Sequence, residues 1–235
     1  MYRVAPQDTH QETQLAMNRL REKGYRQFQI KIGADWSHDI DHIRAVVPLL
    51  QPGEKAFADA NQGRRVDEAL RVARATRDLD YILEQPCRTY AECMQVKQQT
   101  DLPMKLDECI TDFDTIQRVV EDRGAEIICL KISKQGGLSK ARRMRDYLIE
   151  HRFAVVCEDS WGGEIVTATL SHLAASTPPE FLVNATDLHN YNTCSTGSPG
   201  PVTENGCLFA PDKPGLGVEP DFDQLGNPVF DTAAQ

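Results

Sequence analysis

The sequence predicts an α/β fold, a modified TIM barrel of (β/α)7β form in which parallel strands alternate with helices. Eight short apolar runs of strand length are separated by seven longer amphipathic runs, and this alternation continues almost to residue 185. Eight strands with seven intervening helices fit a parallel barrel better than an open sheet. Acidic residues also recur at the ends of successive apolar runs, where a barrel would gather them around one metal.

The elements follow one another at regular spacing along the chain. Strands are expected near 2–5, 27–32, 55–59, 81–84, 103–107, 126–131, 153–157 and 181–184. Helices are expected near 9–23, 37–50, 66–77, 89–98, 112–121, 138–150 and 163–175. Gly24 follows the first helix, a Gln51-Pro52-Gly53 turn ends the second, and Gly124 marks the approach to the sixth strand. Asp112 and Ser139 are expected as helix N-caps.

The end of the chain has a different character. From about Leu188 it is rich in Gly, Pro, Asn and Asp and carries little periodicity. We therefore expect a metal-binding barrel over residues 1–187 and an irregular extension over 188–235. Such a segment should wrap over the surface of the barrel or of a neighbouring capping domain.

Composition excludes several classes of protein. The net charge of −9 argues against a nucleic-acid partner, which would call for clustered Lys and Arg. No apolar run approaches the roughly 18 residues of a membrane span, and the N-terminus lacks a signal-peptide core, so we expect no membrane partner and a cytoplasmic location. The seven cysteines form no Cys-x-x-Cys pair and suggest reduced thiols. Barrels of this type commonly associate, and we expect a homo-oligomer.

Three acids and two lysines stand where barrel chemistry is usually found. Asp59, Glu84 and Asp107 each follow a short apolar run, and Lys31 and Lys131 bracket them. Isolated acids often only cap the following helix. Three at matching strand ends instead suggest ligands for a hard cation, Mg²⁺ first and Mn²⁺ as the alternative. A lysine among other cations and a dication can lose its proton near neutral pH and so serve as a base.

At these five residues the sequence resembles the enolase superfamily, and within it the mandelate racemase/muconate lactonizing enzyme family. The resemblance covers about residues 2–187. It implies that the three acids bind magnesium and that the two lysines face each other across the substrate. A lysine base that acts beside a magnesium ion is typical of this superfamily.

Two departures from the family pattern matter. Gln29 stands where a further lysine is usual, although its amide can still donate a hydrogen bond to a substrate carboxylate. Family members also carry an N-terminal capping domain before the barrel, and this sequence begins directly at the first strand. We therefore expect either a fragment or a pocket without its usual lid.

Residues after the last two strands and beside the acids suggest how a substrate would be held. Trp161 is either a buried staple or a face for a cationic or secondary-amine substrate, with Asp159 or Asp187 pairing the charge. This arrangement resembles the branch that acts on proline derivatives, the cis-3-hydroxy-L-proline dehydratases and hydroxyproline-betaine epimerases. Asn61 is expected to support the metal ligands, and Glu108 to pair with a lysine behind them.

The chemistry implied is removal of the proton alpha to a substrate carboxylate, giving an enediolate. With a hydroxyl at the beta carbon the enzyme would be a dehydratase, most simply of cis-3-hydroxy-L-proline. Without a leaving group it would be a racemase or epimerase of proline or other amino-acid derivatives. The partner expected is thus a small carboxylate, an amino-acid derivative. Two rivals are a catalytically silent truncated barrel and a metal-dependent hydrolase, although the latter would ordinarily need a His-x-His after an early strand.

Overall fold

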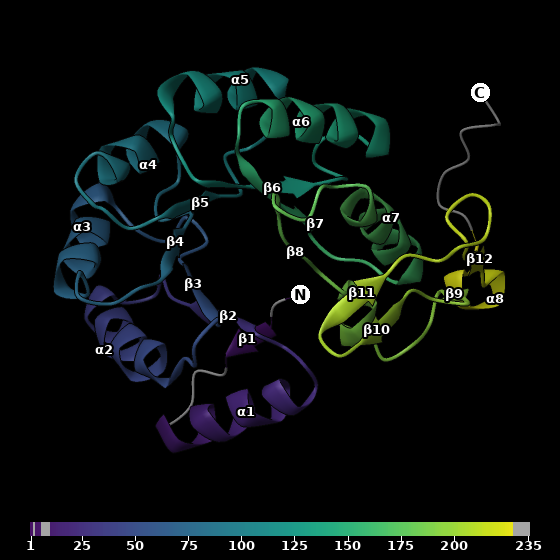
Figure 1. Cartoon of the computed structure of the whole chain (residues 1–235), viewed down its shortest axis with the longest axis horizontal. Helices are drawn as coiled ribbons and strands as arrows, with labels where there is room; N and C mark the ends of the chain where they lie inside the picture. Colours follow the sequence, from purple (N-terminus) through teal and green to yellow (C-terminus); the bar gives the residue numbers. More distant parts are fainter. Residues whose placement is uncertain (2, 6–9, 228–235) are drawn as a thin grey trace.

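The predicted parallel sheet is confirmed. The computed structural model describes residue 1, residues 3–5 and residues 10–227, and its main sheet holds eight strands in the order β1 to β8. Residues 2 and 9, where the first strand and first helix were expected to begin, lie outside the described residues, as do residues 228–235 of the extension. Helices α1 to α7 surround the curled sheet (Figure 1).

The element bounds agree closely with the expected ranges. The strands are β1 (Arg3–Ala5), β2 (Gln27–Lys31), β3 (Lys55–Asp59), β4 (Ile82–Glu84), β5 (Met104–Leu106), β6 (Ile127–Lys131), β7 (Ala154–Glu158) and β8 (Leu182–Ala185). The helices between them are α1 (His10–Glu22), α2 (Trp36–Val46), α3 (Val66–Ala75), α4 (Tyr90–Lys97), α5 (Phe113–Asp122), α6 (Leu138–Glu150) and α7 (Glu164–Ala175), with a 3₁₀ turn η1 (Val47–Leu49) after α2.

Both faces of the sheet are buried, as a parallel barrel requires. Residues on the outer face, such as Phe28, Ile30 and Leu83, belong to the large core beneath the helices. On the inner face, Phe57 and Cys129 belong to a separate small cluster. Because side chains alternate between the two faces, every second residue of a strand points into the barrel. Those nearest the carboxyl ends are the ones able to build a site.

One helix cap is confirmed and one is wrong. Asp112 accepts a hydrogen bond from the backbone N–H of Thr115 and caps α5. Ser139 lies inside α6, whose N-cap is Gly137, because a turn through Gly136 and Gly137, both at positive φ, leads directly into Leu138. Glycine adopts positive φ without a steric penalty, and α6 begins at this turn without a side-chain cap.

The extension contains short ordered pieces where irregular structure was expected. After a 3₁₀ turn, η2 (Leu188–Tyr191), strand β9 (Gly197–Ser198) pairs with β12 (Glu219–Pro220), and β10 (Val202–Glu204) pairs with β11 (Cys207–Phe209). Helix α8 (Phe222–Leu225) follows them. The β10–β11 hairpin lies between α7 and α1 (Figure 1). At Gly24 a β-carbon would collide with the backbone of Asn205, so glycine permits this close approach.

Side chains of β2 and β8 make contact at the seam between the last strand, β8, and the first, β1. Within the described ranges the ladder runs from β1 to β8 and has no backbone pairing between those two ends. Gln27 Nε2 donates to the carbonyl of Val183 at 2.9 Å, and Asn184 Nδ2 donates to Gln27 Oε1 at 2.7 Å.

The described helices include none that is both long and apolar enough to cross a membrane.

Candidate metal and proton-transfer site

The five residues singled out in the sequence meet at one edge of the barrel. Lys31, Asp59, Glu84 and Lys131 are the last residues of β2, β3, β4 and β6, and Asp107 directly follows β5. Since β2 and β6 lie four places apart in the strand order, the two lysines enter from opposite sides of the barrel. The three acids lie between them.

Each acid is paired with a different lysine. Lys31 Nζ lies 2.6 Å from Asp59 Oδ2, and Lys131 Nζ lies 2.8 Å from Asp107 Oδ2. Glu84 Oε1 lies 2.6 Å from the Nζ of a third lysine, Lys105. All three carboxylates are buried, and burying a charge is tolerated only where an opposite charge compensates it. The ammonium groups therefore neutralise the acids in this structure.

Lys105 and Glu158 are parts of the site that sequence reasoning missed. Lys105 is fully buried, 5.6 Å from the ring of Phe57, with its Nζ 3.8 Å from Glu158 Oε2. Glu158 ends β7 and lies 3.7 Å from Lys131 Nζ through Oε1. The signal for Lys105 was its position two residues before Asp107, which places both side chains on the same face of the strand.

The pKa values of two of these lysines, Lys131 and Lys105, are raised, so both are held as ammonium groups. Burial alone would lower the pKa of Lys131, but Cys129, Glu158 and Asp107 together raise it above its ordinary value. Burial likewise opposes the charge on Lys105, and the close carboxylate of Glu84 raises its pKa above the usual range. The lowered pKa expected of a base is thus not found for Lys131, because Cys129, Glu158 and Asp107 surround it.

The acids fit a hard cation in two respects. Asp107 Oδ1 is buried and accepts no hydrogen bond, with Lys134 Nζ 3.8 Å away, so it has the capacity to coordinate a cation. Gln29 Nε2 donates to both Asp59 Oδ2 and Glu84 Oε2, at 3.1 and 3.2 Å, and so draws oxygens of two acids together. Carboxylate oxygens without imidazole suit Mg²⁺ or Mn²⁺.

A second group of donor atoms lies closer together than the expected three. Among the described residues, ligand atoms of Asp107, Cys129 and Glu158 lie within 4.8 Å of one another, a closeness that Asp59, Glu84 and Asp107 do not reach. The ammonium of Lys131 lies against both acids of that group. In this structure the group therefore surrounds a lysine, while each of the three expected ligands is paired with a lysine of its own.

Asn61 connects the first acid with its surroundings. Its backbone N–H donates to Asp59 Oδ1 at 2.9 Å, and its Oδ1 accepts from Lys31 Nζ at 2.9 Å. Its Nδ2 donates to Glu108 Oε1 at 3.0 Å, so Glu108 pairs with an amide where a lysine was expected. Burial and the neighbouring Asp107 raise the pKa of Glu108.

The residues expected to hold a substrate are divided between the surface and the interior. Trp161 is 59% exposed, so the buried-staple alternative is wrong; its Nε1 donates to Asn192 Oδ1 at 3.1 Å and its ring lies 5.7 Å from that of Tyr191. Gln29 is buried and directed at the acids. The carboxylate of Asp159 accepts from the backbone N–H of Ser133 at 2.9 Å.

Asp187 is buried at the seam. Its Oδ2 lies 2.7 Å from Arg3 Nη2 and accepts from the hydroxyl of Tyr25 at 3.1 Å and from Nδ2 of Asn190 at 2.9 Å. Like Asp159, it is therefore engaged by other parts of the chain. Trp161 remains the most accessible of the side chains expected to meet a substrate.

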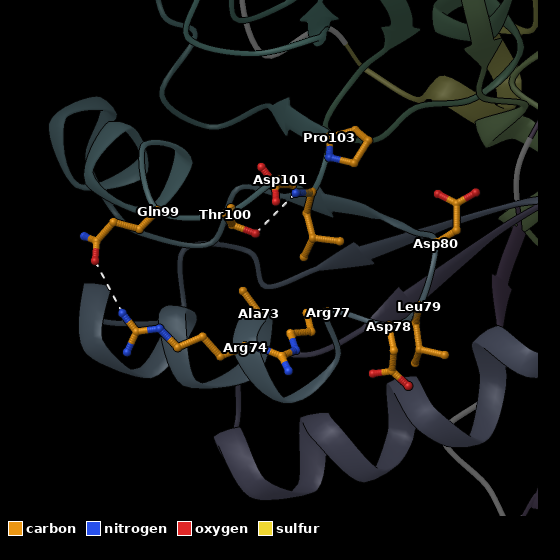
Figure 2. A pocket seen from close by; sticks show the side chains of 11 residues that line it. Ala73, Arg74, Arg77, Asp78, Leu79, Asp80, Gln99, Thr100, Asp101 and Pro103 are labelled. Atoms are coloured by element: carbon orange, nitrogen blue, oxygen red, sulfur yellow. Dashed lines mark hydrogen bonds between the residues drawn. The ribbon is translucent and has the colours of Figure 1, made fainter.

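A cavity of 470 Å³ lies at the other end of the barrel. Figure 2 shows its lining, which includes Arg74 and Gln99, joined by a hydrogen bond of 3.4 Å, and Pro103. Arg74 lies in the last turn of α3, and Gln99 and Pro103 lie in the loop between α4 and β5. Barrel enzymes place their chemistry at the opposite, carboxyl-terminal ends of the strands, so this cavity is not a candidate active site.

Comparison with known proteins gives consistent matches over nearly the whole chain. A family model described as enolase C-terminal domain-like matches residues 12–224. The cis-3-hydroxy-L-proline dehydratase of Roseibium aggregatum is 42% identical over 229 residues, which cover 97% of this chain and 62% of that protein. A crystal structure of a mandelate racemase/muconate lactonizing enzyme from Roseovarius nubinhibens ISM has a TM-score of 0.95 and 67% identity, covering 98% of this chain and 64% of that one.

A further structure from Roseovarius nubinhibens ISM is described as a member of the enolase superfamily complexed with magnesium. It has a TM-score of 0.92 and 28% identity, and the match covers 98% of this chain and 63% of that one. The chain thus spans less than two thirds of the length of each of these relatives.

Proposed function

The chain belongs to the enolase C-terminal domain-like family, as the sequence predicted, and on that premise we propose that it is the proton-transfer barrel of an enzyme acting on a small carboxylate. One observation carries the proposal. Lys31 and Lys131 approach from opposite sides of three buried acids that lie at neighbouring strand ends. A substrate placed between the lysines would present each face of its alpha carbon to one ammonium or amine group.

Asp59, Glu84 and Asp107 are the residues that would hold a divalent cation, Mg²⁺ in the first place and Mn²⁺ as the alternative. When bound, such an ion supplies stabilisation for the negative charge that develops on the substrate carboxylate. The buried Oδ1 of Asp107, which accepts no hydrogen bond, supports this assignment, as does the match to a structure that contains magnesium.

The protein's own groups move the proton. One lysine, neutral at Nζ, takes the alpha proton, and the opposite lysine as an ammonium is placed to protonate a leaving hydroxyl or to return a proton to the other face. Asn61 and Asp59 both hold Lys31, so that its Nζ stays at the edge of the acids. Glu158 Oε1 lies 3.7 Å from Lys131 Nζ and so helps to hold this lysine as well.

We infer that the substrate is cis-3-hydroxy-L-proline or a related amino acid and that the reaction is dehydration. The similarity to the Roseibium dehydratase supports this choice. The exposed indole of Trp161 supports it as well, because an aromatic face attracts a secondary ammonium group. Asp159 and Asp187 have carboxylates that bind other parts of the protein. We assign Asp159 to holding the loop at Ser133 and Asp187 to holding the seam.

Isotope exchange tests the proposal. With Mg²⁺ in deuterium oxide, the protein should release water from cis-3-hydroxy-L-proline, and Lys31→Ala and Lys131→Ala should each lower the rate by at least about 100-fold, as for loss of an acid or base. Lys97→Ala, which breaks a pair with Glu126 far from the acids, is the matched control and should keep its activity.

Alpha-deuterium incorporation without loss of water would replace dehydration by epimerisation. If both lysine variants retained exchange, the assignment of the bases would be wrong. No exchange in a protein that binds Mg²⁺ would identify a catalytically silent barrel.

A further inference from the structure

Gln85, the residue after Glu84, is a buried side chain that connects two of the loops carrying candidate ligands. Its Oε1 accepts hydrogen bonds from the backbone N–H of Asp107 at 2.9 Å and of Cys109 at 3.4 Å. Its Nε2 donates to the carbonyl of Cys87 at 3.0 Å. One amide therefore joins the loop after β4 to the backbone of the ligand after β5.

The backbone of Gln85 extends the connection in both directions. Its N–H donates to the carbonyl of Lys105 at 3.0 Å, and its carbonyl accepts from the N–H of Gln62 at 3.0 Å. Gln62 belongs to the loop that follows Asp59. The loop after Asp59, the residue after Glu84 and the backbone of Asp107 are thus linked through a single position.

The conformation of Gln85 shows that this position is constrained. Its φ is +35°, in a region that side-chain-bearing residues rarely adopt, and Asn61 and Gln62 in the neighbouring loop have φ values of +42° and +68°. The residue before a proline is normally extended, yet Gln85 precedes Pro86. Such backbone persists only where the surrounding structure enforces it, and it concentrates at functional sites.

We propose that Gln85 is a positioning residue that sets the separation of Asp59, Glu84 and Asp107 and thereby their fit to a divalent cation. Asp107 is the ligand that depends on it most, because its own backbone N–H is bonded to the Gln85 amide. Groups that orient metal ligands from behind affect metal affinity without touching the ion. The inference rests on the proposed function only for the presence of a cation at the three acids.

A purely structural role for Gln85 is the competing explanation, and another buried polar residue provides a matched control. Thr76 is fully buried, and its hydroxyl donates to the carbonyl of Val72 at 2.8 Å and lies 2.8 Å from the hydroxyl of Tyr81. It lies between α3 and β4, at the end of the barrel opposite the acids. Thr76→Val should lower the melting temperature and leave Mg²⁺ affinity within about twofold of the parent.

The experiment combines two measurements on metal-stripped protein: Mg²⁺ affinity by calorimetry and hydrogen exchange of the Asp107 and Cys109 amides. Gln85→Met keeps the size of the side chain and removes its hydrogen bonds. It should weaken Mg²⁺ binding by about 10- to 100-fold and speed exchange at both amides. Gln85→Glu keeps an oxygen acceptor in the same place, so the amides of Asp107 and Cys109 should keep most of their protection against hydrogen exchange.

Unchanged exchange at Asp107 in Gln85→Met would overturn the proposal, and so would faster exchange with unchanged Mg²⁺ affinity. If Gln85→Met does not fold, Gln85→Asn, which withdraws the amide by one methylene, carries the same expectations. Absence of Mg²⁺ binding by the parent would overturn the proposed metal site, while exchange would still decide whether Gln85 holds the Asp107 loop.

Discussion

Lys105 is the ammonium group most deeply placed among the acids. Lys31 and Lys131 reach the edge of the barrel, whereas Lys105 is buried beneath it with its Nζ against Glu84. An ion pair in such a place is held by charge compensation, since Glu84 without Lys105 would be a buried charge with no lysine beside it. The second carboxylate oxygen of Glu84, Oε2, accepts a hydrogen bond from Gln29 Nε2 at 3.2 Å.

Removing Lys105 should therefore be costly in the metal-free protein. Lys105→Met preserves the length of the side chain but leaves Glu84 without its cation, and we expect a loss of about 3–5 kcal/mol in the free energy of unfolding. Urea denaturation in the presence of a chelator measures it. The double variant Lys105→Met/Glu84→Gln, which leaves no charge, should recover part of that loss. A loss below about 1 kcal/mol in the single variant would mean that Glu84 does not depend on Lys105.

The candidate ligands could be predicted from the sequence because each stands at the end of a strand, and strand ends are marked by apolar runs and turns. Lys105 lies two residues before Asp107 and so on the same face of the strand, and it could have been predicted in the same way. Gln85 could not have been. Its role depends on a hydrogen bond from its side chain to the backbone of another loop, and no residue spacing encodes the geometry of two loops.

At the scale of elements, α2 shows how a helix buries a polar face. Its His42 is buried, with Nε2 lacking a hydrogen-bond partner in the structure. Nearby, Asp39 accepts from Arg64 Nε at 2.9 Å and from the backbone N–H of Gly33 at 2.9 Å. The helix is thus tied by Asp39 to the loops that follow β2 and β3, next to Lys31 and Asp59.

His42 should make the stability of the fold depend on pH. Burial, followed by the nearby His38, lowers its pKa from the ordinary value of about 6.5. Below that value the unfolded chain binds the proton more readily than the folded chain, so the free energy of unfolding should fall as the pH falls. Denaturation should show that the free energy of unfolding differs less between pH 7.5 and pH 5.5 in His42→Leu than in the parent. An equal difference in both proteins would exclude His42 as a source of the pH dependence.

At the scale of the whole molecule, the barrel depends on contacts between residues far apart in the sequence. The curled sheet is joined at its seam through side chains, and Asp187 after β8 receives bonds from Arg3 in β1 and from Tyr25 before β2. Arg3 also lies over the rings of Tyr25 and Tyr191, with its Cζ 4.9 Å and 4.4 Å from their respective centres. The sequence suggested Asp187 for a substrate charge because it follows the last strand, and nothing local revealed which residues come to meet it.

Asp187→Asn separates the two roles. If Asp187 closes the seam, the variant should lose about 1–3 kcal/mol of stability without any substrate, as for a buried hydrogen-bonded group that loses its charge. Hydrogen exchange should become faster in β1 and β8 before the other strands. Burial raises the pKa of Tyr25 to about 12, with Asp187 adding to the shift, so ultraviolet titration should show a lower pKa for this phenol in the variant.

Glu54→Gln is the matched control for the seam. The side chain of Glu54 is as buried as that of Asp187 and pairs with Arg21 at 2.7 Å, but it ties α1 to the turn before β3, away from the join between β8 and β1. Its loss should lower stability without faster exchange in β8. If Asp187→Asn instead left stability and exchange unchanged and weakened only the binding of an amino-acid substrate, Asp187 would belong to the pocket, and the barrel would be closed by Gln27 and Asn184 alone among the side chains described at the seam.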